Sequence, residues 1–177
     1  MNKPNEIKKS VMLIIDALIL AAFLFLDQFT KYLAIARLKG QKAFVLIDGV
    51  LELQYLENRG SAFGMFQNQK IFLVVVSCLF MAILTFVLLR LPEHKKYGIL
   101  HIALTAIVAG GIGNLIDRLR FDYVVDFISF ILINYPIFNV ADIFVVVGTI
   151  GLFLLFLFYY KEDDLDFLSF KKKKQAK

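Results

Sequence analysis

The sequence contains few of the residues that build disulfide frameworks, metal centres or disordered chains. One cysteine in 177 residues excludes a disulfide framework and a multi-cysteine zinc site. Three prolines, ten glycines and 15% aromatic residues exclude a disordered or collagen-like chain. Charged residues make up only 20% of the chain, against about 25% in ordinary soluble domains. A typical soluble globular domain is therefore also excluded.

Apolar residues are abundant instead. They make up 59% of the chain, and the mean hydropathy of +0.72 is typical of a membrane protein. The length allows one compact unit. The formal net charge of +5 could suggest a nucleic-acid partner, but in so apolar a chain basic residues mark cytoplasmic loops and contacts with anionic lipid. We therefore expect no nucleic-acid partner.

Four apolar runs are long enough to cross a bilayer, which takes about 20 helical residues. Asp16 interrupts the first run, and no small-residue cleavage site precedes Asp27, so this run is a retained span rather than a cleaved signal peptide. We predict an all-α integral membrane protein, a single membrane domain over residues 1–177. The expected spans are about 11–33, 71–89, 97–116 and 140–160, with outer segments at 34–70 and 117–139.

Basic residues predict the orientation of these spans. Most of the 20 lysines and arginines lie in the two chain ends and in the segment between the second and third spans. The positive-inside rule then predicts cytoplasmic termini and places the two outer segments together on the opposite face.

The first outer segment predicts a small β-hairpin. Phe44 to Ile47 and Val50 to Leu56 are separated by Asp48-Gly49, a strong tight-turn signal. Polar and apolar residues alternate in the second strand, which fits an amphipathic platform on the membrane surface. The second outer segment holds an apolar stretch, residues 123–133, which is too short to span and is typical of an interfacial or re-entrant element.

Three aspartates near the outer ends of the third and fourth spans are the candidate functional groups, because ionisable residues at membrane depth are costly and usually functional. Asp117 shares a helical face with Asn114 and Arg118. A carboxylate beside an arginine suits structural support.

Asp126 has apolar neighbours and no nearby cation in the sequence, which raises the pKa of its carboxyl group. Asp142 follows Asn139 by three residues. It could be the acid of a helix capping box, or it could lie close to Asp126, because the connection between the two spans is short.

Two close carboxyl groups share one proton, so that one can activate water while the other hydrogen-bonds the attacked carbonyl, as in aspartic proteases. His94 and His101 lie at the opposite ends of their spans, which excludes a Ser-His nucleophile and a histidine-rich zinc site near the acids. The alternative is a small transporter in which Asp126 and Asp142 carry protons or cations. The absence of broken-helix repeats and the presence of the hairpin disfavour it.

Five sequence blocks, in order along almost the whole chain, resemble the lipoprotein signal peptidase (signal peptidase II) family, aspartic peptidases of the bacterial plasma membrane. The blocks are Asp27-Gln28-Phe29-Thr30-Lys31, Asn58-Arg59-Gly60-Ser61-Ala62-Phe63-Gly64, Gly110-Gly111-Ile112-Gly113-Asn114-Leu115-Ile116-Asp117-Arg118, Val124-Val125-Asp126-Phe127 and Phe138-Asn139-Val140-Ala141-Asp142.

The resemblance implies that Asp126 and Asp142 are the catalytic pair and that Asp117 competes with Asp126 for this role. The implied substrate is a prolipoprotein, cut on the N-terminal side of a cysteine that carries diacylglycerol. Membrane lipids are the other expected partner, with no cofactor, no metal and a monomeric state. The resemblance places Asn58, Arg59 and Gly60 beside the substrate backbone, with Asn114, Arg118 and Asn139 supporting the site.

Two features of the first span stay open. Asp27 and Lys31, at an i, i+4 spacing, form either a local ion pair or a substrate contact. Asp16 matches no block, and the sequence offers no partner for it.

Overall fold

Four long helices form the body of the molecule in the computed structural model, which describes residues 7–61, 65–133 and 135–168. They are α1 (Lys9–Leu38), α2 (Lys70–Arg90), α3 (Gly98–Phe121) and α4 (Val140–Leu154), the last extended by a π-helical stretch, η4 (Leu155–Tyr159). Each helical segment is long and apolar enough to cross a membrane. The predicted fold class, a four-helix membrane protein with a small β platform, is confirmed.

α3 is the central helix of the bundle. In its most apolar stretch 61% of the residues are buried, against 11% in α2 and in α4, so the outer helices present most of their apolar surface outward, where lipid replaces water. Glycines allow close packing around α3. A Cβ atom at Gly110 would lie 2.3 Å from the carbonyl oxygen of Ala141, and one at Gly148 would lie 2.8 Å from that of Ala103. α3 and α4 therefore approach each other almost backbone to backbone.

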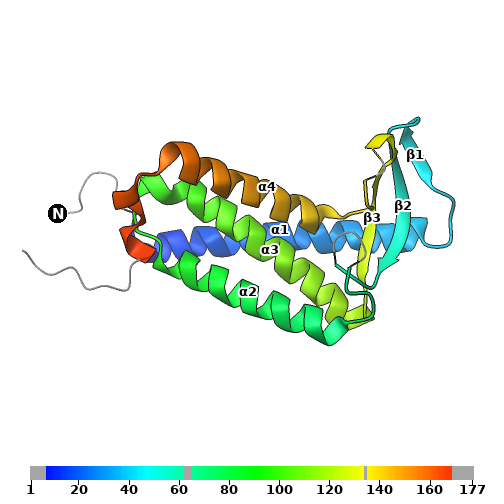
Figure 1. Ribbon diagram of the computed structural model, residues 1–177, viewed down its shortest axis with the longest axis horizontal. Helices are drawn as coiled ribbons and strands as arrows, with labels where there is room; N and C mark the ends of the chain where they lie inside the picture. The colour runs from blue at the N-terminus through cyan, green and yellow to red at the C-terminus, as the bar shows by residue number, and fades with distance from the viewer. Residues whose placement is uncertain (1–6, 62–64, 134, 169–177) are drawn as a thin grey trace, which may run out of the picture.

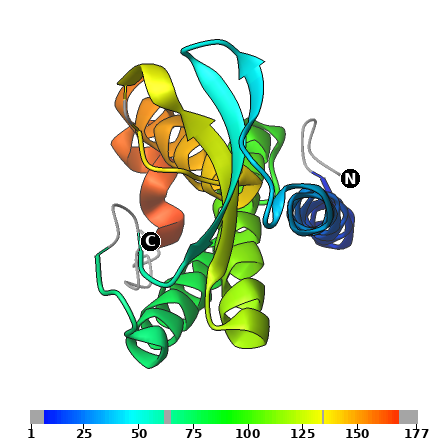
Figure 2. The same ribbon diagram turned by 90° about the vertical axis from the view of Figure 1, so that its right-hand side faces the viewer.

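An antiparallel sheet of three strands lies across one end of the bundle (Figures 1 and 2), which we call the sheet end. Its order is β1 (Phe44–Ile47), β2 (Leu51–Asn58), β3 (Val124–Phe130). Gly49, with a φ of +66°, provides the left-handed conformation that the turn between β1 and β2 requires. The predicted hairpin is thus present.

The third strand gives residues 123–133 a structure that the sequence did not specify. Val124–Phe130 pairs with β2, and a single 3-10 turn, Ile131–Ile133, follows. The interfacial or re-entrant position expected for this stretch stays a prediction. Pairing satisfies the backbone polar groups of an apolar segment that is too short to span. Its length was visible in the sequence, but its partner strand, about 70 residues away, was not.

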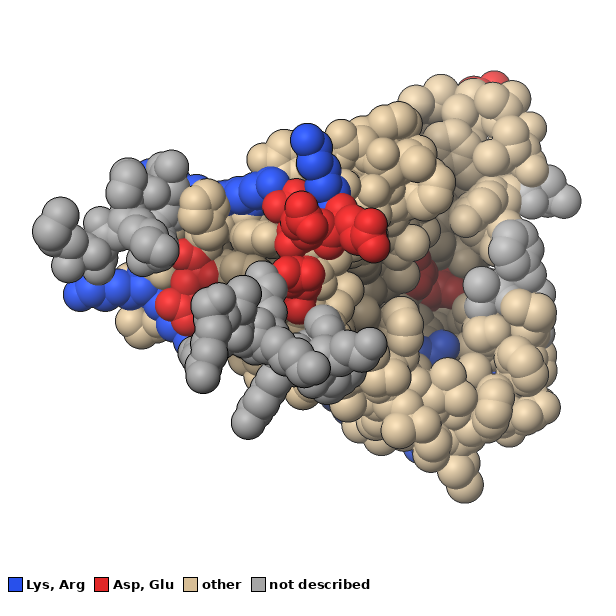
Figure 3. All heavy atoms as spheres, turned by 60° about the vertical axis from the view of Figure 1, so that its left-hand side comes forward, with Lys and Arg blue, Asp and Glu red and all other residues tan. Residues whose placement is uncertain are grey.

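The opposite end of the bundle, the far end, is where α1 begins. It is closed by an apolar cluster of Leu91, Tyr97, Leu100, Leu104 and Tyr160. Charged side chains gather at this end, while the surface between the two ends is largely uncharged (Figure 3). The basic residues at 3, 171–174 and 177, which entered the orientation argument, lie outside the described residues.

Candidate active site

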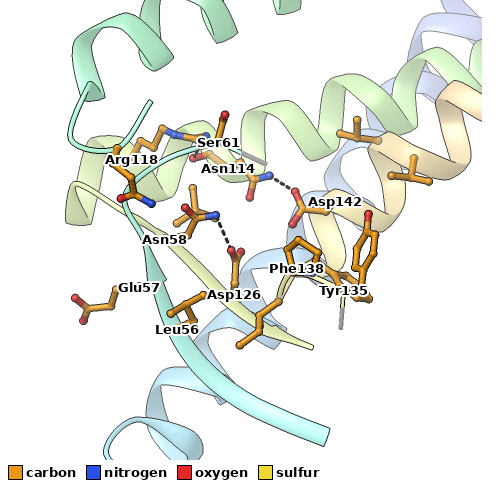
Figure 4. Close-up of a pocket in the computed structure, with 16 residues that line it drawn as sticks. Leu56, Glu57, Asn58, Ser61, Asn114, Arg118, Asp126, Tyr135, Phe138 and Asp142 are labelled. Carbon is orange, nitrogen blue, oxygen red and sulfur yellow. Dashed lines mark hydrogen bonds between the residues drawn. The ribbon is translucent and has the colours of Figure 1, made fainter. Parts of the chain in front are cut away.

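A cavity of about 410 Å³ opens between the sheet and the adjoining ends of α3 and α4 (Figure 4). Its polar lining residues are called the polar wall below, and its apolar lining residues the apolar wall. The polar lining consists of Glu57, Asn58, Ser61, Gln67, Asn114, Arg118, Asp126 and Asp142, and the apolar lining of Leu56, Val124, Tyr135, Pro136, Ile137, Phe138, Val145 and Val146. Both aspartates proposed from the sequence as a catalytic pair therefore face the same cavity.

Strand register brings Asp126 to this cavity. In β3 alternate residues face opposite sides, so Val125 and Phe127 pack beside Ala34 of α1, while Asp126 points the other way. Its carboxyl group is 2% exposed. Asn58 of β2 donates to its Oδ2 at 2.9 Å, and Asn139 donates to its Oδ1 at 2.7 Å. Both carboxyl oxygens are thus held by amide donors.

Asp142 arrives from α4 through the capping box that the sequence suggested. The Asn139 side chain accepts from the backbone N–H of Asp142 at 3.1 Å, and Asp142 Oδ2 accepts from the backbone N–H of Asn139 at 3.0 Å. Its other oxygen accepts from Asn114 at 2.8 Å. Asp142 therefore caps its helix and also lines the cavity, so the two interpretations are compatible.

The backbone before α4 brings the two acids together. Phe138 pairs with Ile128 of β3 through two backbone hydrogen bonds, of 2.8 and 3.0 Å. Asn139, the next residue, is fully buried and contacts Asp126 through its side chain and Asp142 through its backbone and side chain. One residue thus fixes both carboxyl groups.

The two acids have different electrostatic environments. Burial, followed by the negative charge of Asp142, raises the pKa of Asp126 to about 7, although the amide donors Asn58 and Asn139 oppose the shift. Asp142 is half-buried and lies in the first turn of α4, where the helix dipole favours a negative charge. The raised pKa makes Asp126 the group of the pair that can hold a proton close to neutral pH.

Behind the cavity lies a buried ion cluster centred on Lys31. Its Nζ is 3.1 Å from Asp27, 3.0 Å from Asp117 and 2.9 Å from the side-chain oxygen of Asn114. Lys31 is 2% exposed, and both carboxylates are at most 1% exposed. The sequence had paired Asp117 with Arg118, and this expectation was wrong, because the cation comes from another helix. Asp27 and Lys31 do form the local ion pair, and neither lines the cavity.

This cluster also holds the backbone beside each cavity acid. Asp27 accepts from the N–H of Ala141, next to Asp142, at 3.0 Å. Asp117 accepts from the N–H of Val125, next to Asp126, at 3.1 Å. Gln28, which sequence reasoning did not select, donates to both carboxylates. Its place inside the first sequence block was the available signal.

The second sequence block divides between the cavity and its rim. Asn58 lines the cavity, and its side-chain oxygen accepts from Gly60 N–H at 2.9 Å. Arg118 donates to the Gly60 carbonyl at 3.0 Å. Arg59 is not part of the lining and packs over the Tyr123 ring. Residues 62–64 of this block lie outside the described residues.

The family model described as "Signal peptidase (SPase) II" matches residues 19–158, the part of the chain that builds the bundle, the sheet and the cavity. The chain belongs to the signal peptidase II family. The lipoprotein signal peptidase of Caldanaerobacter subterraneus subsp. tengcongensis is 46% identical over 144 residues, which cover 80% of this chain and 96% of that protein. That of Clostridium tetani is 41% identical over 151 residues, covering 84% and 94%.

Solved structures agree with this family assignment. A bacterial membrane enzyme solved at 2.3 Å by the in meso method matches with a TM-score of 0.73 and 26% identity, covering 99% of this chain and all of that one. Another, at 1.9 Å, matches with a TM-score of 0.72 and 25% identity, covering 90% of this chain. The signal peptidase II chain described here is thus a membrane-embedded peptidase of the aspartic type.

The apolar wall of this peptidase's cavity was missed in the sequence. Val145 and Val146 follow Asp142 by three and four residues, so they share its helical face, and this periodicity was the available signal. Tyr135 and Phe138 come from an irregular segment with no such pattern. Within the described residues, no group of three or more His, Cys, Asp or Glu side chains could hold a metal ion.

Proposed function

We propose that the chain removes the signal peptide from prolipoproteins by cutting on the N-terminal side of a cysteine that carries diacylglycerol. The observation that carries this proposal is the joint fixation of Asp126 and Asp142 by Asn139 at one cavity. The family assignment favours this peptidase over the transporter alternative, since the relatives are named as lipoprotein signal peptidases.

Each acid has a distinct part in the proposed reaction. Asp142, at the N-terminus of α4, accepts a proton from a water molecule, and the resulting hydroxide attacks the scissile carbonyl carbon. Asp126, protonated, hydrogen-bonds the carbonyl oxygen and stabilises the tetrahedral intermediate. The proton taken up by Asp142 then passes to the leaving amine as the C–N bond breaks.

The polar network keeps these two carboxyl groups in place. Asn58, Asn114 and Asn139 present their NH₂ groups to the acids because the oxygen of each amide is already occupied, by the Gly60 N–H, Lys31 or the Asp142 N–H respectively. Such fixed donors need not reorganise during the reaction. Arg118 contacts the Gly60 carbonyl at the rim and supports the segment after β2, beside which we place the substrate backbone.

Substrate position follows from the depth of the cavity. The acids lie where helices meet sheet, at one edge of the apolar bundle, and the apolar wall from α4 accepts small apolar side chains next to the cut. Transfer of an acyl chain from water into lipid contributes about 0.8 kcal/mol per CH₂. An acyl chain that is already in the bilayer gains almost none of this free energy when the substrate binds. Recognition therefore depends on placing the peptide bond at this depth.

The cellular location and the oligomeric state of the chain are also part of the proposed function. We place the chain in the bacterial plasma membrane as a single membrane domain, with both termini cytoplasmic and the cavity toward the outer face. The apolar side chains of β1 are about half exposed, at 50–59%, which suits a strand that rests on the lipid surface. We also propose that the chain acts as a monomer, as the family resemblance implies.

The direct test replaces Asp126 or Asp142 with Asn and measures cleavage of a diacylglyceryl-modified precursor by the purified protein in lipid. We expect each variant to lose at least a hundredfold in rate, the usual contribution of an acid or base. Asp48→Asn, in the exposed hairpin turn, is the matched control and should keep wild-type activity. Full activity of either site variant would exclude the dyad. Ion flux into vesicles that depended on the same acids would instead support a transporter.

A further inference from the structure

A second buried polar cluster lies in the half of the bundle away from the sheet. Asp16 of α1 and His101 of α3 are each 5% exposed, and Asp16 Oδ2 lies 2.8 Å from His101 Nδ1. Neither residue belongs to a sequence block or reaches the catalytic cavity. An ionisable pair inside an apolar bundle is costly and calls for a specific role.

Three buried polar atoms of this region have no hydrogen-bond partner among the residues that the structure describes: Asp16 Oδ1, His101 Nε2 and Thr105 Oγ1. Thr105 is 1% exposed and follows His101 by one helical turn, so the two side chains lie on the same face of α3. Buried polar atoms are nearly always paired, either with protein groups or with an ordered water molecule.

The surroundings of His101 have room for such a water molecule. His101 borders a small void between the first turns of α1 and the end of α2, and the lining of this void includes Lys9 and Glu93 but neither Asp16 nor Thr105. The centre of a water molecule can occupy about 10 Å³ of it, close to the minimum for one water. Asp16 lies seven residues after Lys9, or about 10 Å along the helix. A water molecule therefore has only a short path from the membrane surface to Asp16.

We propose that Asp16, His101 and Thr105 form a binding site for ordered water inside the far end of the bundle. A water molecule can form a hydrogen bond with each of the three atoms that lack a partner. It can donate to the carboxylate oxygen, accept from the threonine hydroxyl, and either donate to or accept from Nε2, according to the tautomer of the imidazole. A metal ion would need further ligands, and the described part of the chain offers no third His, Cys, Asp or Glu there.

The site connects the same two helices that support the catalytic acids. α1 and α3 meet at Asp16 and His101 near the far end and at Lys31 and Asn114 near the sheet end. A hydrated cluster at the first point fixes how the two helices are rotated against each other without touching the substrate. Its loss should therefore lower stability while leaving the chemistry intact.

The Thr105→Val variant tests the proposal by the sign of its effect on thermal unfolding. If water binds the hydroxyl, removing it leaves that water short of a partner, and we expect Tm to fall by about 2–4 °C. If the hydroxyl is truly unpaired, an isosteric apolar side chain should raise Tm. Thr149→Val, on the exposed side of α4, controls for the change from Thr to Val in a helix and should leave Tm nearly unchanged.

An unchanged or raised Tm in Thr105→Val, relative to this control, would overturn the proposal. The second test is a high-resolution crystal structure of the full chain in lipid. It should show water density within hydrogen-bonding distance of His101 Nε2 and of Asp16 Oδ1 or Thr105 Oγ1, and a dry cluster would exclude the site. Precursor cleavage by Thr105→Val, measured below its Tm, should match the wild type.

Discussion

The side chain of Asn139 donates a 2.7 Å hydrogen bond to Asp126, while its backbone N–H donates to Asp142 at 3.0 Å. The same residue is the N-cap of α4. Helix capping and the geometry of the two acids are therefore coupled through one buried amide. Substitutions at position 139 can separate the two roles.

Asn139→Ser retains a capping side chain but loses the amide donor to Asp126. We expect cleavage reduced at least tenfold, because Asp126 Oδ1 loses the buried donor that fixes the carboxyl group beside Asp142. Asn139→Ala removes the cap as well and should cost about 1 kcal/mol of stability in addition. Thermal unfolding and precursor cleavage measure the two effects, and equal activity of Asn139→Ser and wild type would contradict the assigned role.

Cleavage should fall as the pH rises through about 7, the pKa of Asp126, because the proposed acid must hold a proton. A profile of cleavage rate against pH checks this. A rate that keeps rising well above pH 8 would contradict the assignment of the proton to Asp126.

The stability of the fold should also depend on the protonation of Asp126, and it should decrease as the pH rises. The folded-state pKa of Asp126 lies above its ordinary value of 3.8, so the folded state binds the proton more tightly. This contribution to stability is present at low pH and declines as the pH rises from about 4 to 7. Asp126→Asn removes the titration, so its unfolding free energy should decline less than that of the wild type across this window. Identical slopes would contradict the raised pKa.

Lys31→Met should destabilise the fold severely. It leaves the carboxylates of Asp27 and Asp117 buried without their cation, and removing one partner of a buried ion pair typically costs about 3–5 kcal/mol. Lys39→Met is the matched control, because Lys39 pairs with Glu57 on the surface and should change stability little. Thermal unfolding distinguishes the two variants, and a mild effect at both sites would contradict the structural role of the cluster.

Gly113→Ala should disturb the same cluster by steric overlap. A Cβ atom at this position would lie 2.3 Å from Asp27 Oδ2, so the carboxylate must move away from Lys31. We expect lower stability and lower activity. Gly98→Ala, whose Cβ would meet no atom within 4 Å, should be neutral or slightly stabilising because alanine favours helix. Precursor cleavage and Tm of both variants provide the comparison.

Local sequence patterns predicted much of this structure. Four apolar runs predicted the four helices, Asp48-Gly49 predicted the hairpin turn, and the spacing of Asn139 and Asp142 predicted a capping box. Each of these features depends on residues within a few positions of one another. The raised pKa of Asp126 was predicted as well, but it is caused by burial in the folded chain and by the negative charge of Asp142.

Contacts between residues far apart in the chain could not be predicted from such local patterns. The pairing of Asp117 with Lys31, of β3 with β2 and of Asp16 with His101 joins residues 66 to 86 positions apart in the chain. Hydropathy and periodicity describe which face of an element is apolar, and they do not specify which other element covers it.

The sequence by itself determined a four-helix membrane protein of the signal peptidase II type, because span length, turn chemistry and motif order are all local properties of the chain. Only the tertiary structure decided that Asp126 and Asp142 face one cavity with Asn139 between them, and that Lys31 rather than Arg118 neutralises Asp117. The physical reason is that burial forces each polar group to find a partner, and the packing of helices against the sheet fixes which partners lie within reach.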